Sequence, residues 1–122
     1  MWVLILVTVL QTGGQWGVPG SEALLFPSQA TCQGAGADLQ KLDKQGEVYS
    51  TRAECFSHAV GPGYGAAMLF LRAANTTAPA VGVSQAQVDF DALEACQVAA
   101  DWLAQQKPPA GISLQGTCLR RW

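Results

Sequence analysis

The sequence predicts an α+β fold of two tandem strand–strand–helix–strand units, with a mixed or antiparallel sheet and both helices on one face. The first observation behind this prediction is an internal repeat. Phe26 stands six positions before Cys32 and Phe90 stands six positions before Cys96, and the sequence Cys-Gln-x-Ala follows in both copies. The second observation is that apolar segments with strand character flank each of these cysteine-bearing segments.

The two units meet at a joint rich in glycine and proline. Residues 1–60 are predicted to form the first unit, residues 61–65 the joint, and residues 66–122 the second unit. The Gly-Pro-Gly tripeptide of the joint interrupts both helices and strand ladders. With 122 residues, 49% of them apolar and 13% charged, the chain is one packed domain or two very small ones.

The cysteine-bearing segments are the predicted helices. In the second copy, Asp91 followed by Glu94 has the spacing of a capping box, so a helix is expected to begin there. It runs to about Gln106, because two prolines follow and the residue before a proline avoids the helical conformation. The helix of the first copy is weaker, since Gly34 and Gly36 each cost about 1 kcal/mol relative to alanine.

Short apolar segments on either side of the helices are the predicted strands. They are residues 23–26 and 81–90 before the helices, and residues 47–50 and 111–114 after them. Residues 50–60 allow two interpretations: the strand continues to Cys55, or a second capping-box pattern starts one or two helical turns. We leave both open at this point.

The first ten residues, MWVLILVTVL, carry no charge and also support two interpretations. Their apolar, β-branched composition is typical of a strand buried on both faces, which agrees with the repeat. Alternatively, residues 1–23 form a signal peptide, since Ser21-Glu22-Ala23 has small residues at the third and first positions before a cleavage site. A membrane-spanning helix needs roughly 20 apolar residues, so no span is expected, and membrane association through residues 1–10 stays an alternative.

The four cysteines predict disulfides. Cys32 and Cys55 are separated by 23 positions and Cys96 and Cys118 by 22, so pairing within each copy places both bonds with one rule. Three connectivities are allowed by the sequence, and this one is preferred. Zinc binding and thioredoxin-like chemistry are disfavoured because the chain has no Cys-x-x-Cys pair. The alternative is four buried free thiols in a reducing cytoplasm.

Catalytic residues, a bound metal and a cofactor are not expected. His58 is the only histidine, which leaves no histidine cluster for a metal and at most one imidazole for acid–base catalysis. A Cys55 thiolate activated by His58 would be a nucleophile, and a thiol-dependent enzyme or redox protein is therefore the alternative function. A disulfide at Cys55 would remove that nucleophile.

Charge and aromatic content bear on partners. The net charge of −2, with no basic cluster beyond Arg120 and Arg121, lacks the positive surface of a nucleic-acid-binding protein. A protein partner, not identified by the sequence, would contact the aromatic and basic residues near the C-terminus. These candidate contact residues are Trp102, Arg120, Arg121 and Trp122.

An MWVL start, the aromatic-x5-Cys-x2-small motif and a final Cys-Leu-Arg-Arg sequence together resemble a loose set of very small bacterial and phage-type proteins. Such proteins begin with an apolar strand or leader and end with a cysteine followed by aliphatic and basic residues. The resemblance covers residues 1–10 and 86–122, and this chain differs in its length, its two additional cysteines and its duplicated helix. No activity is known for that set, so the resemblance implies a fold type and no mechanism.

The expected function is that of a small disulfide-stabilised structural or interaction protein, periplasmic or secreted, without enzymatic activity. Disulfides persist in oxidising compartments, which is the reason for the expected location. The alternatives are the thiol-dependent protein that uses Cys55 and His58, a membrane-tethered envelope protein, and a cytoplasmic protein with free thiols.

Overall fold

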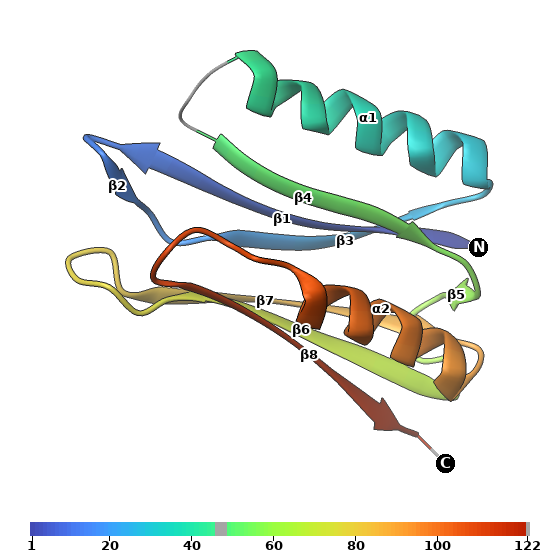
Figure 1. The fold of residues 1–122 in the computed structure, drawn as a ribbon. Coiled ribbons are helices and arrows are strands. Elements are labelled where there is room, and N and C mark those ends of the chain that lie inside the picture. The colour runs from blue at the N-terminus through green and yellow to red at the C-terminus, as the bar shows by residue number, and fades with distance from the viewer. Residues whose placement is uncertain (46–48, 122) are drawn as a thin grey trace.

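The computed structural model describes residues 1–45 and 49–121 and confirms the α+β class, with two helices and antiparallel sheets. The elements in chain order are β1 (Trp2–Thr12), β2 (Gln15–Trp16), β3 (Gly20–Phe26), α1 (Gln29–Gln45), β4 (Tyr49–Phe56), β5 (Ala59–Val60), β6 (Ala67–Asn75), β7 (Gly82–Phe90), α2 (Leu93–Gln105) and β8 (Ile112–Arg120). Figure 1 shows α1 lying on the first sheet and α2 packed beside the second.

The first sheet is built around β1. This strand pairs antiparallel with β3 on one side and β4 on the other, so that Leu4 lies between Leu24 and Cys55. The short β2 pairs with the far end of β1. Val3 and Ile5 have no exposed surface and neither does Leu4, which faces the opposite way. The strand predicted for residues 1–10 is thus an apolar central strand because both of its faces are buried.

The second sheet has the same order of partners. The central β6 pairs antiparallel with β7 and β8, and Leu69 lies between Val88 and Cys118. The prediction placed the strands of both units in one sheet, whereas the structure has two sheets, and β5 at the end of the first unit lies in the second of them. The reason is that the edges of β1 and β6 are both occupied by strands of their own unit.

The two sheets are stacked and share one core. Side chains alternate between the faces of a strand, so Leu4 faces α1 while Val3, Ile5 and Val7 face the second sheet. These three belong to a buried cluster with residues of β6, β7 and α2, among them Leu69. At one side the stack is closed by β3 and β7, where the Ser21 and Ser84 hydroxyls are hydrogen-bonded at 3.0 Å. Burial of this shared cluster is the main stabilising contribution.

Helix α1 begins after a serine cap that the sequence analysis did not identify. The Ser28 side-chain oxygen accepts a hydrogen bond from the Thr31 backbone amide at 3.2 Å, and so satisfies one of the amides left free at a helix start. Gly36 faces the first sheet, where a Cβ atom would lie 3.4 Å from the Leu4 side chain. A Cβ atom at this position would make an ordinary van der Waals contact, so the approach of α1 to β1 leaves room for alanine.

The capping box predicted for α2 is wrong, although the extent of the helix is as expected. The residue before the helix is Ala92, which makes no side-chain cap hydrogen bond. Asp91 instead lies in a bend directly after β7, and its amide donates to the His58 carbonyl oxygen at 2.9 Å. Pairing with the chain after β4 therefore holds Asp91 away from a capping position.

Residues 50–60 are extended, so the helical alternative is wrong and the strand alternative is confirmed. Tyr49–Phe56 pair with β1 along their whole length, which leaves no segment free to coil into a helix. The chain then turns at His58, whose φ is 66°, and residues Ala59–Val60 pair with β7 of the second sheet. The chain before the Gly-Pro-Gly joint is thus already part of the second sheet.

Candidate functional site

The preferred cysteine pairing is confirmed. Cys32 is bonded to Cys55 and Cys96 to Cys118, with Cα atoms 6.1 Å and 6.0 Å apart. Each bond joins the first turns of a helix to the strand that follows it and that forms an edge of the sheet. All four cysteines of the chain are therefore consumed by structural bonds that clamp each helix onto its own sheet.

The Cys55 and His58 pair does not form a thiol site in this oxidised structure. The Cys55 sulfur is bonded to Cys32 and has no thiolate to offer as a nucleophile. The His58 ring lies instead beside Asp91, with Nδ1 3.2 Å from the carboxylate oxygen Oδ2. This contact orients the imidazole toward the start of α2.

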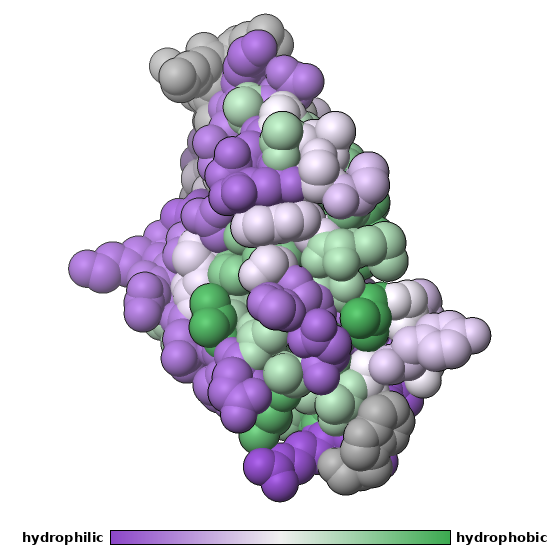
Figure 2. Space-filling view, turned by 90° about the vertical axis from the view of Figure 1, so that its right-hand side faces the viewer, coloured by the Kyte–Doolittle hydropathy of each residue, from purple (hydrophilic) through white to green (hydrophobic). Residues whose placement is uncertain are grey.

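A cleft of about 280 Å³ lies at this start of α2, beside His58. It is lined by Phe56, Ser57, His58, Ala92, Glu94, Ala95 and Val98. Figure 2 views the end of the molecule at which both termini lie, and shows apolar surface interrupted by polar side chains. The cleft is smaller than the sites that usually hold a drug-sized ligand, at about 300 Å³ and above.

The cleft does not contain an assembled catalytic triad. A serine nucleophile requires a hydrogen bond to its general base. Ser57 and His58 both line the cleft, but no hydrogen bond joins their side chains in the described part of the chain. The side chains of His58 and Asp91 are also 62% and 50% exposed, so water competes for their contact. The pair therefore orients a turn and supplies no activated nucleophile.

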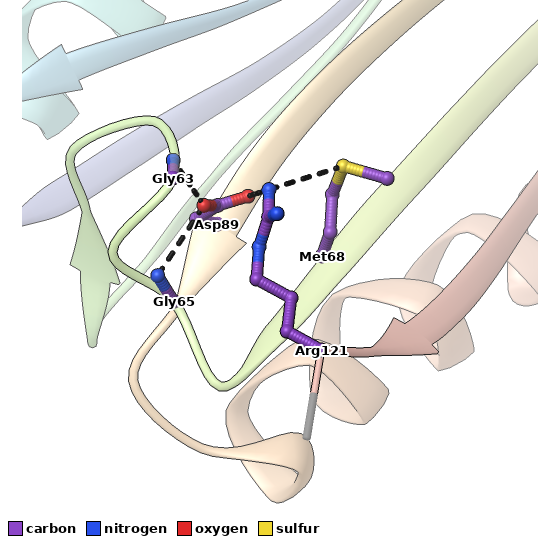
Figure 3. Close-up of polar contacts among 5 residues, drawn as sticks. All are labelled: Gly63, Gly65, Met68, Asp89 and Arg121. Carbon is purple, nitrogen blue, oxygen red and sulfur yellow. Dashed lines mark hydrogen bonds and ion pairs between the residues drawn. The ribbon is translucent and has the colours of Figure 1, made fainter.

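A second polar cluster surrounds Asp89 on β7 (Figure 3). One carboxylate oxygen accepts hydrogen bonds from the Gly63 amide at 2.7 Å and the Gly65 amide at 3.3 Å. The other oxygen is 3.0 Å from the Arg121 guanidinium, which also contacts the Met68 sulfur at 3.7 Å. Only glycine fits at Gly65, because a Cβ atom there would lie 2.6 Å from the Asp89 Cβ and 2.8 Å from the Phe90 carbonyl oxygen.

Asp89 is a structural carboxylate. Its side chain is 4% exposed. Burial favours the neutral acid and would raise the pKa, but the hydrogen bonds from Arg121, Gly63 and Gly65 and the positive charge of Arg121 outweigh it. The pKa of Asp89 therefore lies below its ordinary value of 3.8. The ionised carboxylate joins the Gly-Pro-Gly joint and the C-terminal end of β8 to β7.

The three candidate contact residues that the structure describes do not point to one side of the molecule. Trp102 is half-buried, and its ring packs edge-on against Phe56 at 5.6 Å between ring centroids, on the side of α2 that faces the first sheet. Arg121 contacts Asp89 on the other face of the second sheet, Arg120 is exposed at the end of β8, and Trp122 lies outside the described residues. No sequence pattern predicted the bond between Arg121 and Asp89, which are 32 positions apart.

Over residues 1–45 and 49–121, no group of three or more His, Cys, Asp or Glu side chains is arranged to hold a metal ion. Within the same residues, neither helix has the length and apolar character required to cross a membrane.

These features define a class, a small disulfide-stabilised α+β protein with two stacked antiparallel sheets. Its bonds fit an oxidising environment. No protein family model matches the sequence, and it has no significant similarity to a curated protein or to a solved structure.

Proposed function

We propose that this chain is a non-catalytic structural or interaction protein of an oxidising compartment outside the cytoplasm. The single observation that supports this proposal best is that every cysteine is used to clamp a helix onto a sheet. In the chain-entropy model each loop closure of this size contributes roughly 3 kcal/mol, a large part of the stability of a small domain. Such dependence on disulfides is typical of small secreted domains.

The polar groups that would carry chemistry have structural roles instead. Cys55 is bonded, His58 contacts Asp91 in a turn, and Asp89 is bonded to Arg121 and two amides. A binding role requires only a presented surface, which a rigid disulfide-bonded scaffold supplies at a low cost in conformational entropy. This reasoning favours binding over the thiol-dependent alternative.

The test is the chemical state of the sulfurs in protein purified without reductant. We expect intact mass spectrometry to show both disulfides and no alkylation by iodoacetamide until the protein is reduced. We also expect no reduction of insulin disulfides by the protein in the presence of a dithiol. Rapid alkylation of one thiol in the native protein, or catalytic insulin reduction, would contradict the proposal and favour the thiol-dependent function.

A further inference from the structure

The two faces of the second sheet differ in what covers them. On β6, Leu69 and Leu71 face α2 and the first sheet and are 0% and 2% exposed. Their neighbours on the strand point to the opposite side, where no described element packs. We call this side the open face and define it by Met68, Phe70 and Arg72 on β6, Val83 on β7, and Gln115 and Leu119 on β8.

The corresponding face of the first sheet is covered. Leu4 is paired with Cys55 in the first sheet, and Leu69 is paired with Cys118 in the second, so Leu4 and Leu69 are equivalent positions. Val3 and Ile5 on β1 therefore correspond to Met68 and Phe70 on β6. Val3 and Ile5 are completely buried, because α2 and the second sheet lie on them. The fold thus covers this face of the first sheet with the second sheet and α2, whereas no described element covers the equivalent face of the second sheet.

Each of these two equivalent faces carries an arginine, Arg52 on the first sheet and Arg72 on the second. On the first sheet, Arg52 donates a hydrogen bond of 2.6 Å to the carbonyl oxygen of Lys107, just beyond the end of α2. On the open face, Arg72 is exposed, and its cross-strand neighbours Gln85 and Gln115 are neutral. No described residue forms an ion pair with Arg72, whereas Asp89, the acid on this face, is already bonded to Arg121.

The open face also presents apolar surface. At one end of the face, Met68 and Phe70 are half-buried beside Leu119, which is 46% exposed. Apart from Val83 at the far end, most other outward residues of β7 and β8 are exposed polar side chains, namely Gln85, Gln87, Ser113, Gln115 and Thr117. An apolar area beside one unpaired positive charge is complementary to an apolar surface beside a carboxylate.

We infer that the open face binds an amphipathic helix of a partner protein, with apolar side chains on Phe70 and Leu119 and a carboxylate facing Arg72. This inference rests on the proposed binding function. Three strands spaced about 4.8 Å apart present a strip about 14 Å wide, which accommodates one helix of about 10–12 Å diameter. The occupant would be the same kind of element as α2, which covers the equivalent face of the first sheet together with the second sheet.

A second copy of the chain is a poorer occupant. A strip about 14 Å by 30 Å offers roughly 400 Å² per molecule, about half of the 800 Å² that each partner of a stable complex usually buries. Two copies placed face to face would also bring their Arg72 side chains onto the same small surface. The like charges disfavour the homodimer, and the small area means that the complex with a partner helix is expected to be transient.

The probes are two designed helical peptides of about 16 residues, long enough to form a helix in isolation. They share one apolar face and differ only in the flanking charges, which are glutamates in one peptide and lysines in the other. Each is titrated to millimolar concentration into the full, oxidised chain, and backbone amide NMR shifts are recorded. We expect the glutamate peptide to shift the amides of β6 and β8 and to bind about threefold more tightly than the lysine peptide at low salt.

Two charge variants of the chain identify the binding charge. Arg72→Glu is expected to reverse the preference, so that the lysine peptide binds more tightly than the glutamate peptide. Lys41→Glu is the matched control, because it makes the same change of charge at an exposed site on α1. It should leave the preference unaltered. Arg72→Gln should remove the preference, and it serves as a second variant if Arg72→Glu does not fold.

Two apolar variants identify the binding surface. Leu119→Asp should weaken binding of the glutamate peptide at least tenfold. Val98→Asp is the control, because Val98 is an exposed valine on α2, 60% accessible and outside the open face. It should bind the peptide as the unchanged chain does.

Three results would overturn the inference. They are the absence of shifts on β6 and β8 with both peptides, an unaltered charge preference in Arg72→Glu, and a homodimer in light scattering that Leu119→Asp dissociates. The same samples are checked for both disulfides and for the absence of any thiol that reacts with iodoacetamide. A fully oxidised protein that binds neither peptide refutes this site alone, whereas a reactive thiol refutes the proposed function.

Discussion

Removal of one disulfide tests how this small fold is stabilised. We consider the double variant in which Cys96 and Cys118 are both alanine, which leaves no unpaired thiol. The bond closes a loop with a sequence separation of 22 residues, for which the chain-entropy relation gives about 3.4 kcal/mol at room temperature. Cys96 is completely buried, so loss of its sulfur from the core adds about 1 kcal/mol. The free energy of unfolding should fall by about 4 kcal/mol in total.

Urea unfolding followed by tryptophan fluorescence measures this change, since Trp102 packs against Phe56 in the shared core. The matched control is the double alanine variant of Cys32 and Cys55, whose sequence separation of 23 residues predicts nearly the same loss. A loss below about 1 kcal/mol in either variant would refute the loop-closure argument, because it would mean that packing alone holds the helix on its sheet.

Three further predictions concern the carboxylate cluster, two glycines and the first strand. Asp89→Asn should lower the free energy of unfolding by about 2 kcal/mol at neutral pH, because a buried charge-assisted hydrogen-bond network is lost. The pKa of Asp89 is depressed in the folded state, so its contribution is complete above about pH 4 and disappears as the pH falls from 3.8 through the folded-state pKa. Unfolding measured from pH 7 to pH 2 should therefore show the chain and the Asp89→Asn variant converging in acid, and a constant difference would contradict this. Gly116→Ala should destabilise by about 2 kcal/mol, since its Cβ would lie 2.8 Å from the Leu103 side chain. At Gly34 an added Cβ atom would have no neighbour within 4 Å, so Gly34→Ala should stabilise α1 by up to about 1 kcal/mol. Equal thermal midpoints for Gly116→Ala and Gly34→Ala would be inconsistent with this packing. Deletion of residues 1–23 removes the central strand β1, so the shortened chain should lose its dispersed amide NMR spectrum. A dispersed spectrum would show that the second unit stays folded without an intact first sheet packed on it.

The parts of the fold that were predicted correctly depend on residues close together in the chain. Helix α2 ends at Gln105, as the following prolines predict. The disulfide pairing followed from two nearly equal separations, because the same local unit brings each cysteine of a helix to the next strand. The class α+β followed from the alternation of apolar strands and cysteine-bearing helices.

The errors arose where distant segments compete for the same groups. Asp91 and Glu94 have the spacing of a capping box, but Asp91 is held by the backbone and ring of His58. Ser28 caps α1 by itself, and its position three residues before Thr31 was a signal available in the sequence. Local patterns therefore predicted where the helices lie better than they predicted how the helices begin.

The sequence by itself determined the α+β class and the approximate helices and favoured one cysteine pairing out of three, since these depend on local propensity and on spacing along the chain. Only the tertiary structure decided that there are two sheets, that Asp89 meets Arg121, and that no described element covers one face of the second sheet. These features depend on which faces of distant strands bury one another. An alternating strand pattern is the same whether its second face meets a helix or water.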